Sequence, residues 1–281
     1  MIGQWAGAVA RAFAVVLLIA TPSLILPSVS SDAAQIVALV AIFAGALTLF
    51  EYSATYPGIV EFRDAPPFNR VRFLSMFVTV ALLSLICRGQ TEPTTLTEFV
   101  RAIGYLIGHV LDFPYSPVRL IVMMLPEGAD PAHLLLVRMA AGMAYLISIM
   151  ALAILWIVIR INRWPVRSGS FNVWVNLPTF DPTAGGDVVA RLTRDARFNV
   201  ALGFLMPFLF PALVTAYSIF FEPVTLENHQ TLIWTVSAWA LLPASLFMRG
   251  IALQRIVQLI REQRRRADLE GQEQEPALQP A

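Results

Sequence analysis

The chain has 281 residues, of which 57% are hydrophobic and only 14% are charged. An ordinary soluble domain is about 25% charged. A soluble fold of this size still exposes roughly a quarter of its unfolded-chain surface, so it cannot hide this much apolar area. The composition therefore indicates an integral membrane protein. It excludes a disordered chain, a nucleic-acid-binding domain and, with Cys87 as the single cysteine, a disulfide-rich scaffold.

A bilayer core about 30 Å thick requires roughly 20 mostly apolar residues per helix. The sequence predicts an all-α membrane protein with six transmembrane helices, at about 8–27, 33–51, 71–87, 134–159, 199–221 and 231–248. We expect residues 1–266 to form one membrane domain, and the Glu-, Gln- and Pro-rich segment 267–281 to be disordered. The first stretch also resembles a signal peptide, but no clear cleavage site follows it, so we favour a retained helix.

The positive charges, all arginines, set the predicted orientation. With the N-terminus inside, the cytoplasmic segments hold sixteen of the twenty arginines and eleven of the nineteen carboxylates. Cytoplasmic loops carry an excess of positive residues, so both termini are predicted to be cytoplasmic. Five or seven helices would break this agreement. The lysine-free, alanine- and arginine-rich usage is typical of a GC-rich bacterial genome, and the predicted location is therefore a bacterial cytoplasmic (inner) membrane.

Both long loops carry patterned segments. In the outer loop 88–133, apolar residues recur at helical spacing over 96–113, which predicts an amphipathic helix lying at the interface or capping the bundle. In the inner loop 160–198, alternating residues predict a short strand over 171–177, and 58–63 is a weaker strand candidate. Asp187 is expected to cap a helix. A further helix is predicted over 249–266, with one apolar face formed by Leu253, Ile256, Val257 and Ile260.

Two short segments resemble each other, each just before a helix predicted to run from inside to outside. The matching residues are Arg63, Asp64, Phe68 and Asn69 in the first copy, and Arg194, Asp195, Phe198 and Asn199 in the second. One interpretation is a duplicated helical hairpin. The other, which we favour, is that both segments meet the same local requirements at the start of a helix: a capping residue, an arginine at the headgroups and a phenylalanine at the interface.

The sequence offers only weak candidates for a metal site. They are His109, Asp112, His133 and His229, all in predicted outer segments. Imidazole and carboxylate groups bind divalent metals, but solvated histidines are the simpler interpretation. No cofactor is predicted: the spans contain no histidine for a b-type haem. The spans are also nearly free of charge, with Glu51 and Arg138 near helix ends, where long side chains reach water.

Two further groups of residues are candidate functional positions. Contacts with anionic headgroups or an acidic partner are expected from Arg191, Arg194, Arg197, Arg264, Arg265 and Arg266, at roughly 1 kcal/mol per arginine near the leaflet. Pro207 and Pro211 interrupt backbone hydrogen bonding in the fifth predicted span. They form either a hinge beside a cavity or a static kink, and the kink is favoured.

These features predict a non-catalytic inner-membrane protein. It would assemble, anchor or regulate a membrane-protein partner through its cytoplasmic loop and basic C-terminal helix. The alternative is a transporter or channel for a small or lipophilic solute, with a cavity near the proline-kinked fifth helix. No nucleophile elbow or dinucleotide fingerprint is present, so enzymatic activity is not expected. The predicted contacts are the lipid bilayer, with its anionic cytoplasmic headgroups, and a partner protein, but no nucleic acid.

Overall fold

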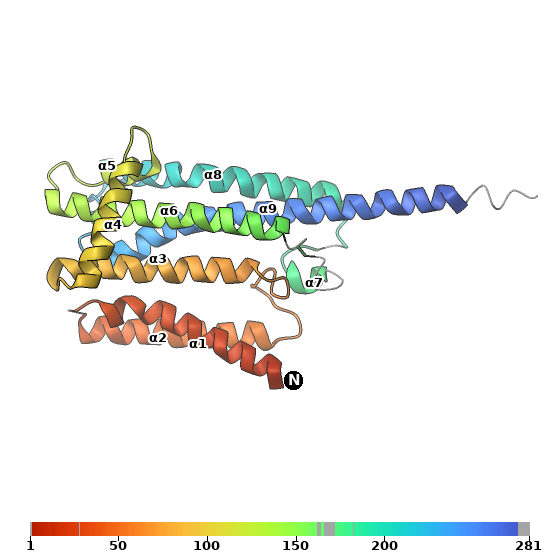
Figure 1. The fold of residues 1–281 in the computed structure, drawn as a ribbon, viewed down its shortest axis with the longest axis horizontal. Coiled ribbons are helices and arrows are strands. Elements are labelled where there is room, and N and C mark those ends of the chain that lie inside the picture. The colour runs from red at the N-terminus through yellow and green to blue at the C-terminus, as the bar shows by residue number, and fades with distance from the viewer. Residues whose placement is uncertain (1, 28, 162–163, 166–171, 182, 275–281) are drawn as a thin grey trace, which may run out of the picture.

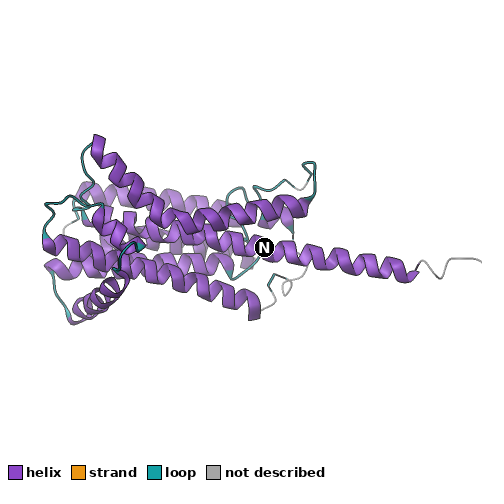
Figure 2. Cartoon of the chain, turned by 90° about the horizontal axis from the view of Figure 1, so that it is seen from above, coloured by secondary structure: helices purple, strands orange, loops and turns teal. Residues whose placement is uncertain are grey.

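The computed structural model describes residues 2–27, 29–161, 164–165, 172–181 and 183–274. Over these residues the chain forms helices and connecting loops, with no strand (Figure 2). The helices are α1 (Ile2–Ile25), α2 (Ser31–Ser53), α3 (Phe68–Thr91), α4 (Thr95–Leu111), α5 (Pro117–Met123), α6 (Pro131–Ile161), α7 (Val173–Asn176), α8 (Val188–Phe220) and α9 (His229–Gln274). Six of them, α1, α2, α3, α6, α8 and α9, are long and apolar enough to cross a membrane, as predicted.

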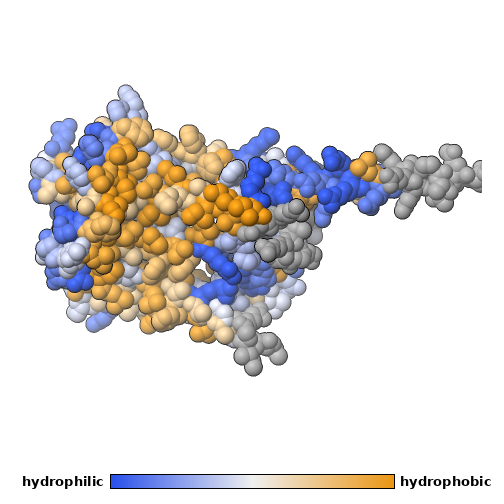
Figure 3. All heavy atoms as spheres, in the orientation of Figure 1, coloured by the Kyte–Doolittle hydropathy of each residue, from blue (hydrophilic) through white to orange (hydrophobic). Residues whose placement is uncertain are grey.

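The six long helices run side by side as a bundle with two different ends (Figure 1). At one end, here called the cap end, α4 lies across the bundle, with α5 beside it. At the other end, the arm end, lie the α2–α3 connection and α7, and α9 projects beyond the rest of the bundle. Hydrophobic residues form a broad band around the visible face, and hydrophilic residues cover both ends and the projecting part of α9 (Figure 3).

The N-terminal hairpin is attached to one side of the bundle. Helix α1 packs against α2 and α3 and touches α9, whereas α2 contacts α1 alone among the described helices. Much of the apolar surface of α2 is therefore uncovered, including Ile42, Phe43 and Phe50. Exposed apolar patches of this kind mark a surface that contacts a membrane or a partner.

Two hydrophobic cores hold the remaining helices together. The core near the cap end joins α3, α4, α5, α6 and α9, with Leu83, Ile121 and Leu136 fully or almost fully buried. The core near the arm end joins α6, α8 and α9 to the α2–α3 connection, where Phe62 is buried, and to the start of α3, where Phe68 is buried. Each core ties several helices together, so the bundle does not depend on the N-terminal hairpin for its interior.

Close contacts between glycines position α4 on α6. A methyl group added at Gly142 of α6 would lie 2.6 Å from the Cα atom of Gly108 in α4. Helices in membranes pack closely where small residues let their backbones approach. The helix predicted over 96–113 is confirmed as α4, which begins with a reciprocal capping box between Thr94 and Thr97.

The apolar residues of α4 divide between two surroundings. Val100 is buried in the core, whereas Phe99, Leu106 and Val110 are exposed. The outward-facing part of this stripe therefore contacts whatever surrounds the bundle. That arrangement is what an interfacial helix requires.

Several predicted helix boundaries differ from those in the structure. Hydropathy identifies the residues that are apolar enough to lie in lipid, but a helix can continue beyond them. The span predicted at 199–221 and the helix capped by Asp187 form one helix, α8. The span predicted at 231–248 and the following basic helix likewise form one helix, α9. Disorder was expected from residue 267, but α9 continues to Gln274. Asp268 and Glu270 lie four residues after Arg264 and Arg266, and opposite charges at this spacing favour helix. Residues 275–281 lie outside the described residues.

Both strand predictions are wrong over the described residues. Within the segment 171–177, Val173–Asn176 form a single helical turn, and Phe171 lies outside the described residues. The turn forms because the Asn172 side chain accepts a hydrogen bond from the Trp174 N–H, a local alternative to strand pairing. The segment 58–63 also pairs with no strand, because the Glu51 carboxylate accepts the backbone N–H groups of residues 58–60.

Candidate functional site

The projecting part of α9 is held at its base by α8. The predicted apolar face is confirmed, since Leu253, Ile256 and Val257 are buried in the arm-end core and Ile260 packs against it. At Gly250 the two helices approach so closely that an added methyl group would lie 2.9 Å from the Ala196 carbonyl oxygen. This packing fixes the direction in which α9 leaves the bundle.

Beyond this contact, α9 continues as an exposed charged helix. We call residues 261–274 the arm, and every side chain from Arg261 to Glu270 is exposed. The arm touches the bundle through Arg264, whose guanidinium lies 2.9 Å from the Asp187 carboxylate at the N-cap of α8. The hydrogen bond from Arg264 lowers the pKa of Asp187 below its ordinary value. The contact is therefore present at neutral pH and is lost as the pH falls through that lowered pKa.

The predicted arginine cluster is divided between structural and exposed positions. Arg191 donates to the carbonyl oxygens of Ala184 and Asp181, at 2.8 and 2.9 Å, and its guanidinium lies over the Phe180 ring. It holds the loop before α8. Arg194 and Arg197 are exposed on α8, and Arg264, Arg265 and Arg266 are exposed on the arm. All six arginines therefore lie at the arm end, on two adjoining helices.

The two copies of the repeated segment have different local structures. In the first copy, Arg63 and Asp64 lie in the turns before α3. In the second, Arg194 and Asp195 lie inside α8. The asparagines also differ: Asn69 donates to the Glu61 carbonyl oxygen, and Asn199 donates to the carbonyl oxygen four residues before it. Phe68 is buried and Phe198 is exposed, so the sequence similarity is not matched by a similar backbone.

The structure shows a polar network at the arm end that spacing did not predict. Glu61 forms a paired contact with Arg249 of α9, with distances of 2.7 and 2.9 Å. Arg63 donates to the carbonyl oxygens of Glu51 and Ala54 at the end of α2. The Glu51 side chain is buried, so the expectation that it reaches water is wrong. Together these groups fix the α2–α3 connection against α9.

A second side-chain network joins this connection to α7. The side-chain oxygen of Asn176 accepts the Asp64 N–H at 3.1 Å, and the Asn176 carbonyl accepts the Phe62 N–H at 2.8 Å. The Trp164 indole donates to the Ala65 carbonyl oxygen at 3.2 Å. Phe62 has a positive φ of 52°, which a bulky residue adopts only where its surroundings enforce it. The α2–α3 connection therefore has a defined conformation, held by its hydrogen bonds to Asn176 and Trp164.

Asp112, one of the weak metal candidates, is instead the centre of an ion cluster at the cap end. Its carboxylate lies 2.6 Å from Nε of Arg119 and 2.8 Å from Nε of Arg138, and its side chain is only 5% exposed. Neither contact meets hydrogen-bond geometry, so the attraction is mainly between charges. The cluster joins the end of α4 to α5 and α6.

The histidines do not converge on Asp112. His109 is exposed and stacks on Tyr105. Nε2 of His133 lies 2.7 Å from the Thr225 carbonyl oxygen. His229 starts α9. Among the residues that the structure describes, no three His, Cys, Asp or Glu side chains form a group that would hold a metal ion.

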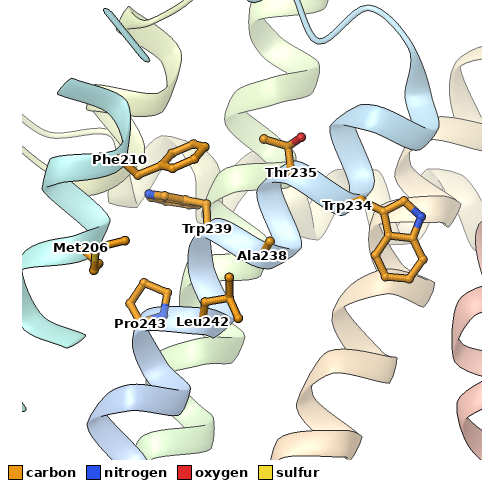
Figure 4. A pocket seen from close by; sticks show the side chains of 8 residues that line it. All are labelled: Met206, Phe210, Trp234, Thr235, Ala238, Trp239, Leu242 and Pro243. Carbon is orange, nitrogen blue, oxygen red and sulfur yellow. The ribbon is translucent and has the colours of Figure 1, made fainter. Parts of the chain in front are cut away.

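The two prolines of α8 lie beside an apolar cavity. Proline at 211 removes the N–H that would bond the Pro207 carbonyl, and the Trp239 indole of α9 donates to this oxygen at 3.0 Å. The adjacent cavity, of about 370 Å³, lies between α8 and α9 and is lined by Met206, Phe210, Trp239 and others (Figure 4). The freed carbonyl is thus capped by the neighbouring helix, which favours a stable kink.

Comparison with known protein families, characterised proteins and solved structures gives no match.

Proposed function

We propose that this protein is a non-catalytic component of a bacterial cytoplasmic membrane that anchors or assembles a partner protein through the arm. The observation that supports this is the continuity of α9. Its 46 residues correspond to about 69 Å at 1.5 Å per residue, roughly twice the thickness of a bilayer core. The same helix therefore belongs to the bundle and extends a charged rod outside it.

The arginine distribution supports placing the arm in the cytoplasm. Sixteen of the twenty arginines lie on the predicted cytoplasmic side, which includes the arm end. In this orientation both termini are cytoplasmic. The exposed arginines of α8 lie near the anionic headgroups, and α4 lies at the opposite interface.

The chemistry of the arm favours a partner with an acidic surface. The arm holds four arginines and four carboxylates, but the arginines all lie within residues 261–266, whereas three of the carboxylates, Asp268, Glu270 and Glu273, follow them. The first part of the arm is therefore positively charged. A helix that is polar on all sides gains little stability from burial within its own chain. Its exposed arginines are well suited to charge-assisted hydrogen bonds with carboxylates.

This proposal predicts that changing two arm charges releases the partner. We expect the double variant Arg265→Glu with Arg266→Glu to migrate at the size of the protein alone, whereas the wild type migrates as part of a larger assembly. We expect Arg265→Lys with Arg266→Lys to leave the assembly largely intact, because the positive charge is kept. The measurement is native gel electrophoresis of membranes from the native host, solubilised in mild detergent. A wild-type protein that migrates alone, or variants that all migrate alike, would contradict the proposal.

The apolar cavity beside Pro207 and Pro211 favours a second candidate function, transport of a lipophilic solute. Its lining is aliphatic, aromatic and sulfur-containing. The polar side-chain atoms in it are the hydroxyl of Thr235 and the indole nitrogens of Trp234 and Trp239. For this candidate, Pro207→Ala and Pro211→Ala are expected to change solute flux in proteoliposomes, because they restore the backbone hydrogen bonds of α8. Unchanged flux in both variants would remove the role assigned to the kink.

A further inference from the structure

A cavity lies between the N-terminal hairpin and the rest of the bundle at the arm end. It consists of two adjoining hollows of about 600 and 440 Å³, which share five lining residues. Its walls come from α1, α2, α3, α9 and the α2–α3 connection. Both volumes fall within the range of about 300–1,000 Å³ typical of ligand sites.

The charges that line this cavity are unbalanced. Its lining includes five arginines and two carboxylates. Glu61 is committed to Arg249, and Asp64 lies 3.3 Å from Nε of Arg63. The remaining arginines, which form no ion pair with another described residue, are Arg11, Arg70 and Arg72. The site therefore has a surplus of positive charge and favours an anion.

Polarity changes along the cavity in the same direction on three helices. On α9 the lining runs from Ala238 to Arg249, about 16 Å at helical rise. On α3 it runs from Met76 past Arg72 and Arg70 to Phe68, and on α1 from Leu18 to Arg11. In each case the arginine is nearer the arm end. The cavity is therefore charged where headgroups would lie and apolar toward the middle of the bundle.

The charged end has rigid walls. The Glu61–Arg249 contact fixes the connection to α9, and the carboxylate of Glu51 fixes the backbone of residues 58–60. Binding at such a site requires little reordering of the protein, which favours affinity.

We infer that this cavity binds one glycerophospholipid with an anionic headgroup. Its phosphate lies at the charged end, where Arg70 lines one hollow and Arg72 lines the adjoining one, and an acyl chain follows the apolar side of α9. A negative phosphate complements the unpaired guanidinium groups. An acyl chain complements the lining formed by Leu18, Met76 and Leu242. The lipid would fill the space between the hairpin and the bundle, and this binding does not depend on the proposed partner of the arm.

Lipid retention in defined nanodiscs tests this inference. The full chain is reconstituted in nanodiscs containing equal amounts of phosphatidylglycerol and phosphatidylcholine, released into mild detergent, and analysed for bound lipid by native mass spectrometry. We expect the wild type to retain one phosphatidylglycerol in preference to phosphatidylcholine. Arg70→Gln with Arg72→Gln is expected to reduce this preference at least about tenfold, given the attraction of each arginine for anionic lipid.

A matched control separates the cavity from general surface charge. Arg160→Gln with Arg261→Gln removes two exposed arginines at the same end but outside the cavity lining, and should leave the preference unchanged. Leu18→Trp enlarges a side chain at the apolar end of this cavity and should also reduce retention while leaving the arginines in place. Equal retention of both lipids by the wild type, or equal loss in the control, would overturn the inference. So would release of the lipid by millimolar inorganic phosphate, which would identify a free-phosphate site.

Discussion

Replacing Asp112 with asparagine is expected to destabilise the protein by about 2 kcal/mol. The carboxylate is the shared counter-ion of Arg119 and Arg138 and is almost fully buried. Removing one partner of a fully buried ion cluster costs about 3–5 kcal/mol, because the remaining charges lose their compensation. The two arginines are 40% and 30% exposed, and solvent screening reduces this cost. The melting temperature in detergent should fall by several degrees.

The pair between Arg88 and Glu92 provides the control for this substitution. It also lies at the cap end, but its side chains are 37% and 50% exposed. Exposed pairs contribute about 0–1 kcal/mol, so Glu92→Gln should change the melting temperature little. Equal effects of Asp112→Asn and Glu92→Gln would show that the Asp112 cluster does not stabilise the contact of α4 with α5 and α6.

The second large effect is expected at the contact between α4 and α6. In Gly142→Ala the new Cβ atom would meet the Cα and N atoms of Gly108 at 2.6 and 2.8 Å. These are backbone atoms, so rotation of a side chain cannot relieve the overlap and the helices must separate. Overpacking typically costs about 1–3 kcal/mol, and alanine recovers up to about 1 kcal/mol of helix propensity. We expect a net destabilisation, measured as a lower melting temperature.

Gly7→Ala is the matched helical control. There the nearest atom to a new methyl group is the end of the flexible Arg11 side chain, at 2.8 Å. This chain can move aside, so the gain in helix propensity should dominate and stability should stay the same or rise. A stable Gly142→Ala variant, melting with or above the wild type, would show that α4 and α6 separate at no cost.

The fold could be predicted to the extent that it follows from hydropathy and helical spacing. The six spans are visible because each presents a long apolar surface, and α4 is visible because its apolar residues recur every three or four positions. The continuity of α8 and of α9 was not predicted, because in each helix a charged segment continues the apolar span outside the apolar window, and in α9 it runs on to Gln274. The single turn of α7 was mistaken for a strand because four residues are too few to distinguish the two periodicities.

The arm arginines and the apolar face of α9 could be predicted because they lie on one helix. The polar network at the arm end could not. Glu61 and Arg249 are 188 positions apart, and nothing in local spacing relates them. Glu51 lies at the end of a predicted span, where a carboxylate usually reaches solvent. Its actual partners are the backbone N–H groups of a turn, which are present in every sequence and so leave no residue-specific pattern.

The separate position of the N-terminal hairpin has a consequence for the order of biosynthesis. Helices α1 and α2 leave the ribosome well before α9 and pack mainly against each other. One wall of the cavity thus belongs to helices made early and the opposite wall to a helix made later. The hairpin can insert as a unit, but its docking against α9 must wait until α9 has been translated. The space between these helices therefore closes late in synthesis.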